Sequence, residues 1–217
     1  MSTFRFALRK RDFEVMFMSQ IHIACKIVLI GDGGCGKTTL RKKFMGESLH
    51  EEYIPTLGVD FSIKRITIGN RAMITFQIWD LAGQPHFKEV RAPFYKGARG
   101  AMVVYDVSNL ASFRNVPLWV MELLKNCGYK VPIVLVANKI DLRDKVFPHI
   151  TTELGMELAK ELENILELPV PYIETCAIRG DNVDKAFYKL ARMIIEVELR
   201  KKKGVLDAKT TSEGQKH

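Results

Sequence analysis

The sequence predicts an α/β fold built on a six-stranded, mostly parallel sheet (one antiparallel strand) with helices on both faces. Short apolar runs alternate with helical patterns along most of the 217 residues. The glycine-containing loops follow the ends of apolar runs, which is where open parallel sheets bind ligands. The apolar content of 47% is enough for the core of one domain with short tails.

The elements are expected in the order strand, helix, two strands, and then helix and strand in alternation. A Gly69-Asn70 pair predicts a two-residue hairpin, so the strands beside it are antiparallel neighbours. Pro93 should shorten or kink the helix that contains it. Strands are expected at 23–30, 59–63, 74–78, 101–105, 132–137 and 170–175. Helices are expected at 37–45, 87–96, from a cap at Ser108 or Asn109 to Leu124, from a cap at Thr151 or Thr152 to Asn164, and at 183–200.

The loop after the first strand has the pattern G-x-x-x-x-G-K-[ST] from Gly31 to Thr38. Its glycines let consecutive backbone N–H groups turn inward around a polyphosphate. Lys37 adds a positive charge for the β- and γ-phosphates, and Thr38 can offer its hydroxyl to Mg²⁺. The first turn of the following helix presents unpaired amides to the same anion, so this loop predicts a nucleotide phosphate site.

The base is indicated by Asn138-Lys139-Ile140-Asp141 at the end of the fifth strand. The Asp141 carboxylate can accept from N1–H and the exocyclic amine of guanine, a pairing that adenine cannot offer. An unpaired buried polar group costs about 1–3 kcal/mol, which favours guanine. Asn138 can bond a ring acceptor and neighbouring loops, and the Lys139 stem can lie along a ring face.

The net charge of +8 belongs mostly to the two ends of the chain. Residues 1–20 carry +2, from four basic and two acidic residues, and residues 200–217 carry +4, from six and two. This distribution favours tails that meet an anionic surface over a nucleic-acid groove across the fold, so no nucleic-acid partner is expected. From Gly204 the composition predicts a disordered polar tail.

Residues 1–20 leave two interpretations open. In the first they form a segment that binds a membrane surface or a partner through Arg5 and its basic neighbours. In the second they are a disordered leader, or they lie upstream of the true start at Met16 or Met18. Four scattered cysteines, no long apolar run and no secretory signal predict a cytoplasmic location. Peripheral contact with an anionic membrane is a weaker hypothesis. Such contact is expected not to involve prenylation, because no cysteine follows Cys176.

Five motifs in this order resemble those of the Ras-superfamily small GTPases, with the Rab branch the most similar. They are Gly31–Thr38, Tyr53-Ile54-Pro55-Thr56 with Gly58-Val59-Asp60-Phe61, Trp79-Asp80-Leu81-Ala82-Gly83-Gln84, Asn138–Asp141, and Glu174-Thr175-Cys176-Ala177. The resemblance implies the G domain of a P-loop NTPase over residues 21–203, between an N-terminal extension at 1–20 and the tail at 204–217.

The resemblance also implies the cofactor Mg²⁺, with GTP and GDP as substrate and product. Thr38, Thr56 and Asp80 would hold the metal. Gln84 would orient the attacking water and Lys37 would stabilise charge on the phosphates, so these two are the catalytic candidates. Thr56 and the Gly83 amide would sense the γ-phosphate, and Cys176 and Ala177 would support guanine through their backbone. The nucleotide-binding candidates are Gly31, Asp32, Gly33, Gly34, Cys35, Gly36, Lys37, Thr38, Thr39, Tyr53, Thr56, Gly83, Asn138, Lys139, Asp141, Cys176 and Ala177.

Three positions depart from the family pattern. Leu49 replaces an aromatic residue that flanks guanine in many relatives, and Ile178 replaces a common lysine, so the base pocket is expected to be weaker. Ile54 stands where the similar α subunits of heterotrimeric G proteins carry an arginine. Intrinsic hydrolysis should therefore be slow, and an arginine supplied in trans could accelerate it on the order of 10³–10⁵-fold.

These motifs favour a GTP-hydrolysing molecular switch over two alternatives. In its GTP-bound form the switch would engage an effector through residues 47–61 and 82–96, and activating and exchange proteins would be its regulators. The first alternative is a GTP-dependent binding scaffold with negligible hydrolysis. The second, an adenine-specific P-loop enzyme, is abandoned if GDP rather than ADP copurifies with the protein.

Overall fold

The computed structural model describes residues 21–48, 58–69 and 72–213 of the chain. The predictions made for residues 1–20, Leu49, Tyr53, Ile54 and Thr56 lie outside these described residues.

Six strands form one sheet in the spatial order β2-β3-β1-β4-β5-β6. β2 and β3 are antiparallel, and every other neighbouring pair is parallel, which confirms the predicted sheet. Because the carboxyl ends of the parallel strands share one edge, the loops that follow them lie together. The strands are β1 (Ile21–Ile30), β2 (Val59–Ile68), β3 (Ala72–Leu81), β4 (Ala98–Asp106), β5 (Ile133–Asn138) and β6 (Tyr172–Glu174).

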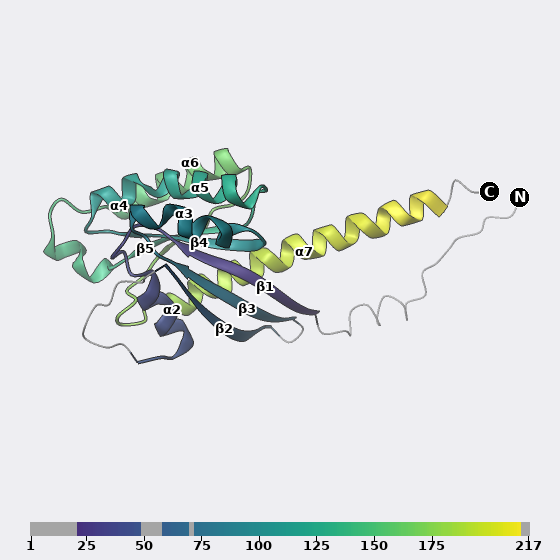
Figure 1. Ribbon diagram of the computed structural model, residues 1–217, viewed down its shortest axis with the longest axis horizontal. Coiled ribbons are helices and arrows are strands. Elements are labelled where there is room, and N and C mark those ends of the chain that lie inside the picture. The colour runs from purple at the N-terminus through teal and green to yellow at the C-terminus, as the bar shows by residue number, and fades with distance from the viewer. Residues whose placement is uncertain (1–20, 49–57, 70–71, 214–217) are drawn as a thin grey trace, which may run out of the picture.

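Helices cover both faces of this sheet (Figure 1). α2 (Lys37–Met45) and α7 (Val183–Glu213) lie on one face, while α5 (Val116–Cys127) and α6 (Thr152–Leu166) lie on the other. Each face has its own apolar cluster: Phe44 and Phe187 belong to the first, Trp119 and Leu162 to the second. The central strands β4 and β5 are thus buried on both sides, as their nearly continuous apolar sequences predict, whereas the edge strand β2 is largely exposed or half-buried.

Two of the predicted helices are divided. The segment 87–96 is three short pieces, η1 (Pro85–Phe87), α3 (Lys88–Arg91) and η2 (Ala92–Tyr95). Pro93 lacks the N–H that a continuous helix needs, so the break has a local cause. The helix expected to reach Leu124 is also two helices, α4 (Leu110–Arg114) and α5, and Pro117 stands near the start of the second.

The sequence offers two candidate cap residues for each of two helices, and the structure shows which one caps each helix. The Asn109 side chain accepts from the Ser112 N–H at 3.2 Å before α4. Thr151 accepts from the Leu154 N–H at 3.4 Å before α6, which extends to Leu166 rather than Asn164. Both caps satisfy a backbone donor that a helix start otherwise leaves free.

The last helix is longer than the sequence predicts. α7 continues through Gly204 to Glu213, although a tail without secondary structure was expected from Gly204 onward. A glycine inside a helix costs only about 1 kcal/mol relative to alanine, so composition alone placed this boundary wrongly. The far end of α7 projects beyond the sheet (Figure 1). Among the described residues, no helix combines the length and the apolar character needed to cross a bilayer.

Replacing Phe187 of α7 by alanine should lower the free energy of unfolding by about 3–5 kcal/mol. The Phe187 ring is fully buried and stacks on Phe44 with centroids 3.8 Å apart. Urea unfolding of the protein in one fixed nucleotide state measures the effect. Leu199→Ala on the same helix is the control, because Leu199 is 43% exposed and should change stability by only about 0.5 kcal/mol. Equal losses in the two variants would contradict this account of the core.

Candidate functional site

The loop between β1 and α2 surrounds a buried lysine. The Lys37 ammonium donates hydrogen bonds of 2.8 Å to the carbonyl oxygens of Gly31 and Asp32, and Lys37 is 6% exposed. Gly36, just before α2, has a φ of 97°, and a Cβ there would lie 2.2 Å from Asn138 Nδ2. Only glycine allows this conformation together with this approach.

The start of α2 completes an environment suited to an anion. Gly36 has no side chain to cap the helix, and the described first turn contains no acidic residue. The N–H groups of the first turn have no partner within the helix and carry the positive end of the helix dipole, beside the Lys37 charge. The other predicted phosphate-site residues lie in the same loop and turn, which we call the cradle (residues 31–39): Gly33, Gly34, Cys35, Thr38 and Thr39.

A carboxylate at the end of β3 meets the cradle. The Thr38 hydroxyl donates to Asp80 Oδ2 at 2.5 Å, and Asp80 is completely buried. The other oxygen, Oδ1, is buried and has no hydrogen-bond partner among the described atoms. Burial raises the pKa of Asp80, although the Thr38 hydroxyl and the Lys37 charge act in the opposite direction. A buried carboxylate oxygen without a partner beside a threonine hydroxyl fits the oxygen donors that Mg²⁺ prefers.

The loop after β3 packs directly on the cradle. A Cβ on Gly83 would lie 2.4–2.5 Å from backbone atoms of residues 31–33, so no other side chain fits there. Gln84 follows, and its Cγ lies 3.6 Å from the position that a Cβ on Gly33 would take. The Gln84 Oε1 atom is buried without a hydrogen-bond partner among the described atoms. An unsatisfied amide oxygen is therefore held next to the cradle.

The side chain of Asn138 joins three loops. Its Nδ2 donates to the Cys35 carbonyl at 2.9 Å, and its Oδ1 accepts from the Thr175 hydroxyl at 3.0 Å and from the Ala177 N–H at 3.1 Å. Asn138 is buried. These bonds hold the cradle, the end of β5 and the loop after β6 in one arrangement, as hydrogen-bonded buried amides do.

Asp141 and Lys139 each have a partner that the sequence did not indicate. The Cys176 thiol donates to Asp141 Oδ1 at 2.9 Å. Burial raises the pKa of Cys176, and the bond to Asp141 raises it further, so this thiol stays protonated and remains a donor. Lys139 has a φ of 64°, and its ammonium lies 2.7 Å from Asp106 Oδ2 at the end of β4. Ile178, one of the positions that depart from the family pattern, is 66% exposed.

A second ion pair ties the segment after Asp141 to the segment before Cys176. Arg143, in η3 (Ile140–Lys145), lies 2.7 Å from Glu174 Oε1 at the end of β6. The same oxygen accepts from the Thr152 hydroxyl at 2.7 Å. Although burial alone would raise the pKa of Glu174, the hydrogen bonds from Arg143 and Thr152 lower it, so the carboxylate stays charged.

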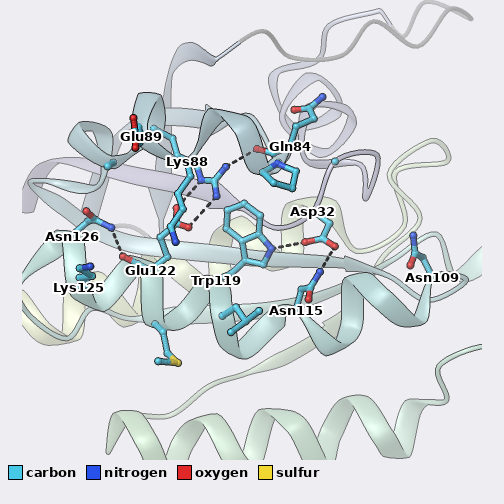
Figure 2. A pocket seen from close by; sticks show the side chains of 17 residues that line it. Asp32, Gln84, Lys88, Glu89, Asn109, Asn115, Trp119, Glu122, Lys125 and Asn126 are labelled. Atoms are coloured by element: carbon cyan, nitrogen blue, oxygen red, sulfur yellow. Dashed lines mark hydrogen bonds and ion pairs between the residues drawn. The ribbon is translucent and has the colours of Figure 1, made fainter.

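The side chain of Asp32 points away from the cradle, into a neighbouring hollow of about 910 Å³ (Figure 2). Its Oδ1 accepts from Trp119 Nε1 at 2.7 Å and its Oδ2 from Asn115 Nδ2 at 2.8 Å. The main chain of Asp32 is part of the cradle, while its carboxylate contacts α5. The hollow lies between the cradle, the segment 83–92 and α5 (Figure 2).

Several residues of this region were missed by reasoning from the sequence: Asp106, Cys176 as a donor, Arg143, Trp119, Arg91 and Glu122. Most are far in the chain from the groups they contact, so no motif spacing indicates the contact. Asp106 is the exception, because a carboxylate at the end of a buried strand is a local signal that could have placed it near the ligand edge.

Comparisons with known proteins show what this chain is similar to. The sequence pattern of the Ras family matches residues 26–196. The chain is 37% identical over 171 residues to the Ras-related protein SEC4 of Saccharomyces cerevisiae, a match that covers 79% of this chain and 75% of the relative. The Ras-related protein SEC4 of Candida albicans is also 37% identical, over 79% of this chain and 77% of the relative.

Proposed function

Because the chain belongs to the Ras family of small, GTP-binding GTPases and is similar to the Rab protein SEC4, we propose that it is a molecular switch that hydrolyses GTP to GDP and phosphate. The observation that supports hydrolysis best is the Gln84 side chain, which lies against Gly33 with its amide oxygen unsatisfied. An amide in that position can accept a hydrogen bond from a water molecule and orient it toward a terminal phosphate.

The proposed phosphate site is the cradle. Lys37 would turn its ammonium from two carbonyl oxygens to the β- and γ-phosphates, supported by the N–H groups at the start of α2. We assign Mg²⁺ to Thr38, Asp80 and Thr56; the unpartnered Asp80 Oδ1 supports this assignment, and Thr56 lies outside the described residues. Bound there, Mg²⁺ would neutralise negative charge on the phosphates.

The proposed switch depends on contacts with the γ-phosphate. The Gly83 N–H and Thr56 would contact this group, so its loss would release the loops that carry them. Gly83 packs against residues 31–33 without space for a Cβ. A small displacement of the cradle would therefore also displace the loop that contains Gly83.

The proposed guanine site consists of Asn138, Lys139, Asp141, Cys176 and Ala177. The Asp141 carboxylate would accept from N1–H and the exocyclic amine of guanine. The hydrogen bond from the Cys176 thiol would hold the Asp141 side chain in place, and the ion pair with Asp106 would hold the Lys139 side chain. This preorganisation reduces the ordering that nucleotide binding requires.

An apolar surface on β2 and β3 is the proposed effector site. Phe61 and Ile63 are 44% and 56% exposed, and the ring centroids of Phe61 and Trp79 lie 4.8 Å apart. Trp79 in turn lies 5.2 Å from Phe94, within the 82–96 segment. An aromatic patch at the surface is typical of protein interfaces, and this one is in contact with a segment that the γ-phosphate would move.

Gln84→Leu should slow the hydrolysis of bound GTP on the order of 10²-fold, because leucine cannot orient the attacking water. Single-turnover phosphate release from the purified protein measures this rate over hours. Gln77→Leu is the matched control, since Gln77 is exposed on β3, the strand that ends just before this loop, and should leave the rate unchanged. If the wild-type protein retains GTP without releasing phosphate, the GTP-dependent scaffold replaces the switch.

A further inference from the structure

A buried arginine connects the 82–96 segment to α5. Arg91 is 3% exposed, and its Nε and Nη2 atoms lie 2.6 and 3.0 Å from the two carboxylate oxygens of Glu122. Glu122 also accepts from the Tyr95 hydroxyl at 2.8 Å. Although burial by itself would raise the pKa of Glu122, the hydrogen bonds from Arg91 and Tyr95 lower it, so both members of the pair are charged. A two-point arginine–carboxylate contact fixes orientation as well as distance.

The remaining nitrogen of Arg91 holds the backbone beside the proposed water site. Its Nη1 donates to the Gln84 carbonyl at 2.9 Å and, more weakly, to the Ala82 carbonyl at 3.3 Å. The Gln84 carbonyl accepts a second bond, from the Phe87 N–H at 3.1 Å. Two donors on one carbonyl fix the peptide plane that follows Gln84, and with it the direction in which the Gln84 side chain leaves the backbone.

Trp119 joins the same network to the cradle. The guanidinium carbon of Arg91 lies 4.3 Å from the centroid of the Trp119 ring, and Trp119 Nε1 donates to Asp32. Figure 2 shows the Trp119 side chain between Asp32 and the bonds that reach Gln84 and Glu122. The cradle, α5 and the loop of Gln84 are therefore connected through buried contacts on one side of the hollow.

We propose that Arg91 is a positioning residue for hydrolysis, which acts by holding the Gln84 backbone while Glu122 holds Arg91. The proposal rests on the proposed hydrolytic function. Among the described residues, the hydrogen bonds of Arg91 go to Glu122 and to the carbonyls of residues 82 and 84, and none goes to the cradle. Its loss should therefore affect the rate of hydrolysis far more than the affinity for nucleotide.

The test replaces Arg91 by lysine, which keeps the charge but cannot contact both Glu122 oxygens and the Gln84 carbonyl with a planar set of donors. Single-turnover phosphate release is measured for wild type, Arg91→Lys, Gln84→Leu and the double variant. Arg91→Lys should slow release by roughly 10- to 100-fold, with GDP and GTP affinities within about 2-fold of wild type. In the Gln84→Leu background it should cause no further loss, because the group it positions is already absent.

Two further variants separate positioning from general stability. Glu122→Gln removes the charge that holds Arg91 and should reproduce the pattern of Arg91→Lys. Arg99→Lys is the matched control, since Arg99 pairs with Glu198 of α7, on the sheet face opposite to α5. It should leave phosphate release at the wild-type rate, and its thermal midpoint is compared with that of Arg91→Lys.

The outcomes are distinct. An Arg91→Lys rate equal to wild type, an equal slowing with and without Gln84, or a loss of nucleotide affinity in proportion to the rate would each overturn the positioning role. Wild-type protein that retains GTP and releases no phosphate would instead overturn the proposed hydrolytic function, and the role of Arg91 with it. Slowing that disappears in the Gln84→Leu background, with affinity retained, supports the proposal.

Discussion

Replacing Lys37 by methionine is expected to abolish tight binding of both GDP and GTP. The Lys37 ammonium is almost fully buried and donates two hydrogen bonds of 2.8 Å to carbonyl oxygens of the cradle. In the nucleotide-bound protein the same charge would face the β- and γ-phosphates. Hydrogen bonds to charged groups contribute about 1.5–3 kcal/mol each, so losing two of them corresponds to a loss of affinity of roughly 10²–10⁴-fold.

The measurement is the equilibrium dissociation constant for GDP, obtained with a fluorescent analogue in excess magnesium. Lys42→Met is the matched control, because Lys42 lies on the same helix, is partly exposed and is not part of the cradle. It should bind GDP as tightly as wild type does. If both variants retain wild-type affinity, the cradle is not the phosphate site.

The fold was predictable because its main signals are local. Short apolar runs gave six strands, and the Gly69-Asn70 pair gave the antiparallel neighbours β2 and β3. The meeting of Gly36, Asp80 and Asn138 at one edge also follows from the sequence, since carboxyl ends of parallel strands share that edge. The functions of these residues remain predictions, to be tested by the variants described above.

Other features depend on contacts that no local pattern encodes. The Asp32 side chain turns to Trp119 and Asn115, and Arg91 reaches Glu122 on α5, because helix α5 packs beside the cradle in three dimensions. The sequence gives no spacing rule for such partners. The extension of α7 through Gly204 was missed for a different reason: a glycine and a polar composition weaken a helix without ending it.

Replacing Asp141 by asparagine should exchange the preference for guanine with one for xanthine. The carboxylate offers only acceptors, which suit the N1–H and exocyclic amine of guanine. An amide offers one acceptor and one donor, so its NH₂ group would face the amine of guanine, another donor. A site built to hydrogen-bond one group rejects a mismatched analogue on the order of 10⁴-fold, and GDP affinity should fall by about that factor.

The contact with Cys176 determines which way the new amide should face. Burial and the Asp141 bond keep the Cys176 thiol protonated, so it is a donor and favours the amide oxygen on its side. The NH₂ group then takes the place of the other carboxylate oxygen, where it can donate to the C2 carbonyl of xanthine. The amide oxygen has two lone pairs, so it can accept from N1–H as well as from the thiol. Competition of xanthosine and guanosine diphosphates for the protein measures the exchange. Asp144→Asn, an exposed change in the same segment, should keep the wild-type order, and a variant of Asp141 that still prefers GDP would show that another group reads the base.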